Sequence, residues 1–500
     1  MNVSVTSSRT TSVTTSEREN GLLAPDSESP NLRTWSSGEP GTFETFRRIG
    51  TAPIVVAVLS PFVALTTGYV QKFLLAVVVL DIPLQIGTHF YYREDDAALG
   101  ALGGLGISVT TIALSGLYLS WCIRALAQRG NEGRPALHFS VGLTSYLAIA
   151  ALSTLLAQNV TLSLFELFLF FESYLVYVYV ANTIRTRQEI LFVVKFLLIG
   201  CLLESSLMVA ARFMDMQAIL GTVSLKFQID PDAARAGLLR VGGTVGSPNT
   251  AAAYLGIVLV AAASVIFASV QRGLKWLAAG VLGLGGVALI YTYSRGGWVA
   301  FALAIIGLCW VARRRRRLAL AAPIVTAAVF TLLSLPFYDL ISDRLFGSDK
   351  GSAESRVPLM KLALRISKDN PLLGVGPNNF TAAMDRYLTP EFRRGFLYAV
   401  HNKYLLVLSE TGIAGMLAYV AFLLGTLRNG WQTWKAGDRL LSPLALGFTA
   451  AIVGHMVQMS VELFRGRPVQ QLLWLIAAVL FVMNRIHLRS SLLNPLSDIT

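Results

Sequence analysis

Apolar residues fall into repeated blocks of bilayer length along most of the chain. A bilayer core about 30 Å thick needs roughly 20 consecutive apolar residues per helix. The pattern therefore predicts an all-α fold, a polytopic transmembrane helix bundle of about 12–13 spans. The candidate spans are residues 52–68, 72–90, 102–123, 138–156, 162–181, 190–211, 250–270, 274–293, 296–312, 318–338, 402–427, 443–461 and 469–485.

The composition agrees with a membrane protein. Hydrophobic residues make up 54% of the chain and charged residues only 14%, whereas an ordinary soluble domain has about 25% charged residues. The formal net charge of +13 would also suit a nucleic-acid partner, but the basic residues lie in short loops between the apolar blocks. Because basic loops stay in the cytoplasm, we expect membrane lipid as a partner and no nucleic acid.

The basic loops also predict which segments face outward. The loops at 124–135, 184–188, 271–275, 313–317, 428–439 and 485–489 are basic and share the cytoplasmic side if every intervening span is real. Residues 212–248, the junction 293–296 and residues 339–400 then lie outside. The side of the N-terminus stays open, because the 53–70 block, which Pro61 interrupts, is either a first span or a re-entrant segment.

The chain divides into four parts by pattern. Residues 1–45 are rich in Ser, Thr, Glu and Pro, which predicts a disordered polar tail. Residues 46–211 hold the N-terminal transmembrane helices, and residues 212–427 form a core that includes the outer loop 339–401. Residues 428–500 hold the C-terminal transmembrane helices and a short cytoplasmic tail.

The loop from 339 to 400 predicts an ordered, helical cap. Loops longer than about 12–15 residues are usually functional or disordered. Residues 357–366 repeat their apolar side chains with helical spacing, and glycines and prolines around Gly374 indicate a defined turn. We therefore expect this loop to pack over the outer end of the bundle.

Several arginines lie on the side where positive charge is disfavoured. Arg295 sits between two apolar blocks with almost no loop, and Arg240 and Arg356 lie in the outward-facing segments. Arg295 would be explained by snorkelling to headgroups, but an arginine kept against the topology rule suggests an anionic partner. Guanidinium is the side chain best matched to phosphate oxygens.

His401 places a titratable imidazole where the cap returns to the membrane. It comes immediately before an apolar helix that contains Leu405 and Leu406. One interpretation is an interfacial residue without chemistry, and the other is a general base. The two interpretations carry equal weight for a lone histidine.

Five motifs follow one another along the chain: Arg240-x-Gly-Gly-Thr-Val-Gly-Ser-Pro-Asn249, Tyr293-Ser-Arg295-Gly-Gly297, Ser355-Arg356, Asn370-Pro-Leu-Leu-Gly-Val-Gly376 and His401-Asn402-Lys-Tyr-Leu-Leu-Val-Leu-Ser-Glu410-Thr-Gly-Ile-Ala-Gly415. In this order, they resemble the O-antigen ligase and Wzy-type O-antigen polymerase family. The resemblance covers about residues 240–415, so the part 212–427 is expected to be an O-antigen ligase-like core.

The resemblance implies a glycosyl transfer that needs no metal and no cofactor, on the periplasmic or outer side of the bacterial cytoplasmic membrane. The donor would be a glycan on undecaprenyl pyrophosphate, and the acceptor a glycan or a lipid core. Arg295 and Arg356 match the arginines that hold the pyrophosphate, and His401 matches the histidine that activates the acceptor hydroxyl. Further candidates to bind pyrophosphate or glycan lie in the same motifs: Arg240, Asn249 and Asn402.

Elementary chemistry agrees with these roles. Negative charge builds on the departing phosphate when the sugar–pyrophosphate bond breaks, so fixed guanidinium groups stabilise the transition state more than the ground state. A neutral histidine is a suitable base for a sugar hydroxyl. No nucleotide-binding loop or His-Glu-x-x-His motif occurs in the sequence, so the activated substrate is expected from the membrane or the outer side.

Two alternatives remain open at this point. The sequence does not separate a ligase from a polymerase, because acceptor identity depends on surface shape. A multi-pass transporter or flippase of lipid-linked glycans would also have many spans and intramembrane charges. Transporters often show two related halves with interrupted helices, and the sequence contains no such repeat; its polar motifs gather on one face.

Overall fold

Helices form most of the chain in the computed structural model, which describes residues 67–127, 137–221, 226–230, 239–313, 356–388 and 397–493 with the isolated Leu335, Tyr338 and Ser342. All of these residues belong to one unit, 61–500. The predicted tail 1–45, most of the candidate spans 52–68 and 318–338, most of the basic run 313–317 and most of the start of the cap loop lie outside the described residues.

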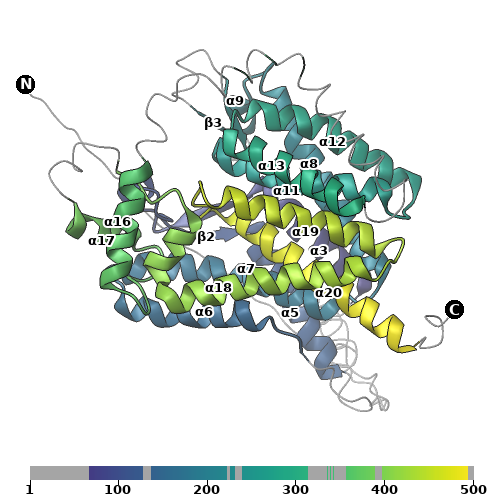
Figure 1. Cartoon of the computed structure of the whole chain (residues 1–500), viewed down its shortest axis with the longest axis horizontal. Helices are drawn as coiled ribbons and strands as arrows, with labels where there is room; N and C mark the ends of the chain where they lie inside the picture. Colours follow the sequence, from purple (N-terminus) through teal and green to yellow (C-terminus); the bar gives the residue numbers. More distant parts are fainter. Residues whose placement is uncertain are drawn as a thin grey trace, which may run out of the picture. The chain divides into compact units, whose positions relative to one another are not determined.

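The elements alternate long helices with short irregular connections (Figure 1). The N-terminal half contains α3 (Gly68–Leu84), β1 (Gly87–Phe90), α4 (Glu94–Ala98), β2 (Leu105–Ser108), α5 (Val109–Ala127), α6 (Val141–Ser153), η1 (Thr154–Leu156), α7 (Val160–Thr183), α8 (Arg187–Ala210), α9 (Met216–Gly221), β3 (Gln228–Ile229) and β4 (Val241–Gly243). The remainder contains α11 (Pro248–Phe267), α12 (Arg272–Tyr291), α13 (Arg295–Ala312), α16 (Arg356–Asp369), α17 (Phe380–Met384), η3 (Asp385–Tyr387), α18 (Lys403–Lys435), α19 (Leu441–Gln458) and α20 (Arg467–Leu493).

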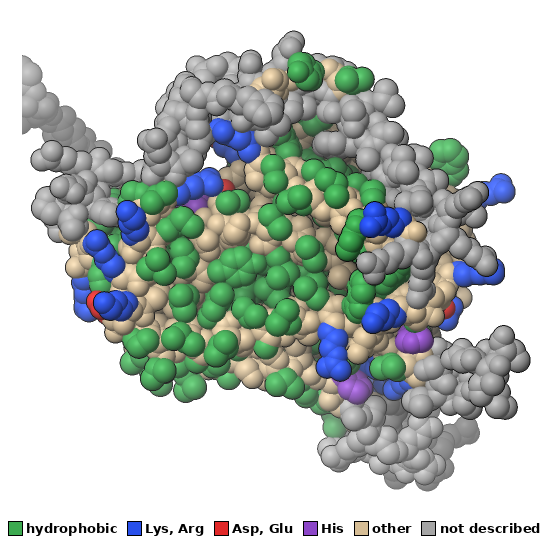
Figure 2. All heavy atoms as spheres, in the orientation of Figure 1, with side chains coloured by type: hydrophobic (Ala, Val, Ile, Leu, Met, Phe, Trp, Pro, Cys, Tyr) green, Lys and Arg blue, Asp and Glu red, His purple; other side chains and the backbone are tan. Residues whose placement is uncertain are grey.

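The predicted all-α polytopic bundle is confirmed. Within the described residues, 9 helices are long and apolar enough to cross a membrane, and α6 with η1 adds a shorter apolar helix. Hydrophobic side chains cover the middle of the face shown in Figure 2, and Lys and Arg side chains lie toward its edges. This distribution is the one expected of a protein whose sides contact lipid.

Two candidate spans, 72–90 and 102–123, were wrong at one end each: the C-terminal end of the first and the N-terminal end of the second. Helix α3 ends at Leu84, because the next residue, Gln85, has a left-handed backbone with φ of 49°. Strands β1 and β2 then form an antiparallel hairpin in which Gly87 pairs with Ser108. The buried carboxylate of Asp81 accepts hydrogen bonds from the backbone amides of Ile86 (2.8 Å) and Thr110 (3.0 Å), which fixes this hairpin to the helix ends.

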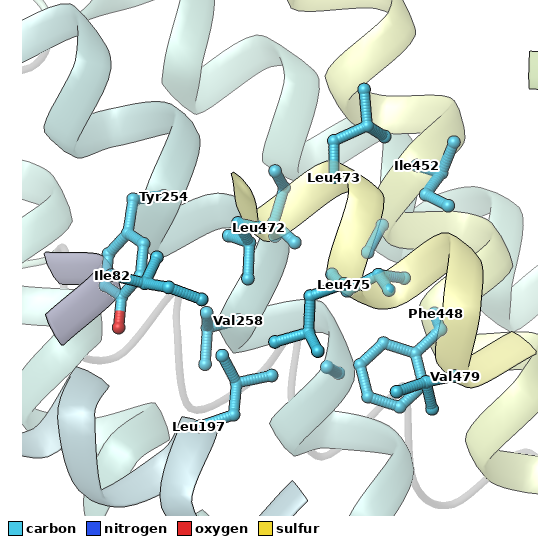
Figure 3. Packing of buried hydrophobic residues seen from close by; sticks show 14 of the residues in the cluster. Ile82, Leu197, Tyr254, Val258, Phe448, Ile452, Leu472, Leu473, Leu475 and Val479 are labelled. Atoms are coloured by element: carbon cyan, nitrogen blue, oxygen red, sulfur yellow. The ribbon is translucent and has the colours of Figure 1, made fainter. Parts of the chain in front are cut away.

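Helix α11 forms the centre of the bundle and packs most extensively against α19 and α12. Buried alanines at 251–253 and 261–263 let neighbouring helices approach closely. At the crossing with α19, a Cβ added to Gly447 would lie only 2.2 Å from the Ser264 side chain. Figure 3 shows Tyr254 and Val258 of α11 packed among Leu197 of α8 and apolar residues of α19 and α20.

The cap has a hydrophobic core of its own. Helix α16 confirms the helix predicted at 357–366, and its buried face consists of residues with helical spacing: Leu359, Leu362, Ala363 and Ile366. These side chains pack with buried residues of α17 and with Leu406 of α18. The cap is therefore attached to the start of α18, as Figure 1 shows for α16 and α18.

The turn around Gly374 docks onto an interruption in α18. Gly412 has φ of 68° inside α18, and a Cβ there would lie 2.2 Å from the Leu372 carbonyl oxygen. The backbone amides of Val375 (3.0 Å) and Ile413 (2.8 Å) donate to carbonyls across this contact. Only glycine fits such a close approach in a left-handed conformation, which explains the Gly residues in both the 370–376 and 401–415 motifs.

Candidate active site

The predicted site residues lie at one end of the bundle. Arg240 precedes β4 and Asn249 is the second residue of α11, while Arg295 and Arg356 are the first residues of α13 and α16. His401 and Asn402 come directly before α18. Residues 459–466 connect α19 to α20. They lie at the same end of the bundle, because Glu462 bonds to both Asn249 and Arg356.

Four side chains form a continuous network at this end, which we call the arginine network: Arg240, Asn249, Glu462 and Arg356. Arg240 Nη2 donates to Asn249 Oδ1 at 2.6 Å, and Asn249 Nδ2 donates to Glu462 Oε1 at 2.6 Å. Arg356 Nη2 reaches the same Glu462 oxygen at 3.3 Å. One carboxylate thus joins two predicted motifs that are far apart in sequence.

The two arginines of the network are also fixed to backbone. Arg240 Nε donates to the Thr292 carbonyl at 2.9 Å, and Nη1 contacts Asp230 at 3.1 Å. Arg356 Nη1 donates to the Val461 carbonyl at 3.1 Å. The guanidinium planes are therefore held in defined orientations, which is the arrangement needed for directed contacts to a phosphate group.

Arg295 lies beside this network. Its neighbour Gly296 sits against Val461, since a Cβ added there would come within 3.2 Å of the Val461 side chain. The junction before it is tightly bent, with Tyr293 at φ of 50° and the Ser294 hydroxyl accepting from the Gly297 amide at 3.3 Å. The sequence's short 293–296 junction thus places Arg295, half-buried, at the start of α13.

Burial changes the ionisation of Glu462 and His401. Burial raises the pKa of the Glu462 carboxyl to about 7, against the opposing charges of Arg356 and Arg240. Burial and the nearby Arg356 guanidinium lower the pKa of His401 to about 4. His401 is therefore a neutral imidazole at neutral pH, although its interaction with the Ala399 backbone opposes the shift in pKa.

Two neighbours set the position of His401. Its ring packs at 5.2 Å, centroid to centroid, against Tyr398. Asn402 caps α18, with Oδ1 accepting from the Leu405 amide at 3.0 Å and Nδ2 donating to the Ser460 carbonyl at 2.8 Å. Both ends of the Asn402 amide are thus bonded within the chain, so in this structure it holds His401 beside the 459–466 connection.

Residues 278–420 match the sequence profile of the O-antigen ligase family. The chain carries an O-antigen ligase domain. This confirms the resemblance drawn from the motifs, and it associates the chain with ligase- or polymerase-type function in surface polysaccharide biosynthesis. The matched residues include Arg295, Arg356, His401 and Asn402 but neither Arg240, Asn249 nor Glu462. No curated protein matches the chain.

A second charged cluster contains Glu410 of α18. We call it the buried ion cluster, and its members are Glu166, Glu410 and Arg465. Arg465 Nη2 contacts Glu410 at 2.5 Å, and its Nε lies 3.9 Å from Glu166. Arg465 Nη1 also donates to Asn378 Oδ1 at 2.6 Å. The cluster ties α7, α18, the cap and the connection after α19 together.

Sequence reasoning gave no role to Glu462, Arg465 or Arg467. A usable signal was present, because Glu-Leu-Phe-Arg-Gly-Arg at 462–467 puts two arginines between spans on the outward side. The topology argument that selected Arg295 applies equally to them. Arg467 forms an ion pair with the buried Asp81 at 3.0 Å.

Proposed function

We propose that this protein transfers a glycan from an undecaprenyl-pyrophosphate carrier to a glycan or lipid-core acceptor, without a metal ion, on the outer side of the bacterial cytoplasmic membrane. The activity is that of an O-antigen ligase or a polysaccharide polymerase. The observation that carries the proposal is the convergence of oriented arginines and a neutral histidine within and beside the O-antigen ligase domain.

In the proposed reaction, Arg295 and Arg356 hold the pyrophosphate of the donor. The acceptor oxygen forms a bond to the anomeric carbon, and the bond from that carbon to the phosphate oxygen breaks. The electron pair leaves with the lipid pyrophosphate, where guanidinium groups stabilise the charge that develops. A single displacement of this kind inverts the anomeric configuration.

His401 is the proposed general base, which takes the proton of the acceptor hydroxyl as the new bond forms. Its lowered pKa keeps the imidazole unprotonated through the physiological range. Arg356 next to it favours the neutral form.

Glu462 serves as a positioning residue in this proposal. Its carboxylate holds Asn249 and Arg356 in one geometry while the pyrophosphate is absent. Arg240, bonded to Asn249, extends the same network toward the junction that carries Arg295. Preorganised cations of this kind lower the barrier because they need little rearrangement during the reaction.

The experiment that tests the proposal separates donor binding from transfer. We expect His401→Ala to bind the lipid-linked glycan normally and to lose transfer by about 10²–10⁴-fold, as for removal of a positioned base. Glycan transfer would be measured in membranes of a strain that lacks the chromosomal copy, at matched protein levels. His487→Ala, near the opposite end of α20, is the control.

Wild-type transfer by His401→Ala would exclude it as the base. Loss of donor binding in this variant would instead assign His401 to the pyrophosphate site. Normal transfer by His487→Ala is required for either conclusion.

A further inference from the structure

A cavity lies outside the arginine network and the ligase domain. It is bounded by the β1–β2 hairpin, the first half of α7 and the start of α20, and its interior measures about 120 Å³. None of the residues that line it has a part in the proposed transfer chemistry.

The lining combines an apolar wall with polar groups at its rim. Phe165, Phe168 and Leu169 of α7 form the wall. Thr88, His89 and Ser108 of the hairpin contribute hydroxyl and imidazole groups, and glycines at 87, 104 and 106 leave the backbone open to close approach. Aromatic surface with a few directed polar groups is typical of sites for small polar ligands.

The charged groups at this cavity are bonded within the chain. Its lining residue Arg467 is paired with Asp81 at 3.0 Å. Glu172 accepts from Ser108 at 3.2 Å and from Gln471 at 2.8 Å. Burial, together with Lys226 and Arg467, lowers the pKa of His89, which favours the neutral imidazole. A pyrophosphate gains little here, whereas hydroxyl groups find both donors and acceptors.

Hydrogen bonds and side-chain packing connect the segment beside the cavity to the loop that carries His401. The Ala399 amide donates to the Leu99 carbonyl at 2.9 Å, and Tyr398, which packs on His401, lies against Gly100. Asn378 accepts from the Leu102 amide at 2.7 Å and donates to its carbonyl at 2.9 Å. Leu102 itself lines the cavity, so a ligand there contacts the segment that positions the proposed base.

We infer that this cavity is a binding subsite for a neutral sugar ring, with the apolar face of the ring against Phe168 and its hydroxyl groups toward His89 and Ser108. The inference rests on the proposed function for the source of the sugar, which is either the donor glycan or the acceptor. It adds a second recognition site to the one at the arginines.

The test uses the full chain with Cys122, Cys201 and Cys309 replaced by alanine and a single new cysteine at Thr88, an exposed cavity-lining position. The rate of maleimide modification is measured with neutral mono- and disaccharides, with sodium pyrophosphate, with a short polyprenol and with the lipid-linked donor. We expect saccharide at ten times its Kd to slow modification about 11-fold. Glu94→Cys, exposed outside the cavity, is the matched control.

Two further variants define the site. Phe168→Ala should abolish the protection of the Thr88 cysteine by saccharide. Gly106→Leu should fill the cavity without distorting the backbone, because a Cβ at Gly106 lies at an ordinary 3.6 Å from the His89 ring. Gly68→Leu, at a glycine with nothing within 4 Å, controls for the added bulk.

The outcomes separate this inference from the proposed function. Protection by the lipid-linked donor assigns the sugar to the donor glycan, and protection by free saccharides alone assigns it to the acceptor. Equal protection by pyrophosphate or by polyprenol, or saccharide protection unchanged in Phe168→Ala, overturns the subsite. Donor binding that still depends on Arg356 would leave the proposed transfer standing in that case.

Discussion

The connection between α19 and α20 holds two charged clusters that differ mainly in exposure. In the arginine network, the side chains of Arg356 and Arg240 are 31% and 18% exposed. In the buried ion cluster, those of Arg465, Glu410 and Glu166 are 4%, 5% and 1% exposed. Both clusters pair arginine with glutamate, and Glu462 and Arg465 are only three positions apart in the sequence.

The difference shows how one chemistry serves two purposes. The buried cluster has two carboxylates around Arg465, with Lys403 close by, so its formal charges balance within the chain. In the network, Glu462 is shared between Asn249 and Arg356, and Arg356 has further N–H groups at an accessible surface. We therefore expect the first cluster to matter for folding and the second for substrate binding.

Removing Arg465 is expected to have the largest effect. Arg465→Ala leaves two buried carboxylates with Lys403 as their remaining nearby counter-charge, and breaking a buried pair in this way costs about 3–5 kcal/mol of folding free energy. Thermal unfolding of the purified protein in detergent measures the loss. Arg428→Ala, an exposed arginine on α18, should change stability by less than about 0.5 kcal/mol. Equal stability of the two variants would contradict the assignment of Arg465 to folding.

Most of the helical fold was predictable because membrane insertion depends on a local property. A span must be apolar over a bilayer length, and that requirement is visible in any window of the sequence. The ends of α3 and α5 were not predictable in this way. They depend on Asp81 and on pairing between Gly87 and Ser108, which are contacts between separate segments.

The site was predictable to the extent that topology selects residues. The arginines stood out because positive charge is disfavoured on the side predicted to face outward, and His401 stood out as a titratable residue where the cap returns to the membrane. Glu462 did not, because its role depends on Asn249, 213 positions earlier, and on Arg356, 106 positions earlier. A carboxylate near a span end carries no signal of its partners, and only folding brings these three residues together.

The next largest effect is expected in the arginine network. Arg356→Ala is expected to weaken binding of undecaprenyl pyrophosphate by about 1.5–3 kcal/mol, the value of a hydrogen bond to a charged group. The fold should be unaffected, since Arg356 is partly exposed. Arg295→Ala should behave alike. Lysine at either position should restore binding only in part, because it lacks the planar fork of guanidinium.

Binding is measured by titrating the lipid into detergent-solubilised protein, with unfolding temperature as the check on folding. Wild-type affinity and normal glycan transfer by Arg356→Ala would remove Arg356 from the pyrophosphate site. A large drop in the unfolding temperature of Arg356→Ala would show that Arg356, like Arg465, stabilises the fold. The two clusters would then not differ in their roles.

The smallest expected effect is a pH dependence that belongs to Glu462 alone. Its pKa is raised to about 7 by burial, so the carboxyl gains a proton as pH falls from 8 to 6. Loss of this negative charge leaves Arg356 and Arg240 less compensated, and donor affinity should therefore increase toward lower pH, by at most about tenfold per pH unit for one proton.

The lipid-linked glycan is the proper probe, since both of its phosphates stay ionised over this range. Glu462→Gln should bind with a flat profile, while His401→Ala should keep the wild-type slope because the His401 pKa of about 4 lies below the range. A slope that persists in Glu462→Gln would show that another group titrates at the arginines and that Glu462 only supports the fold.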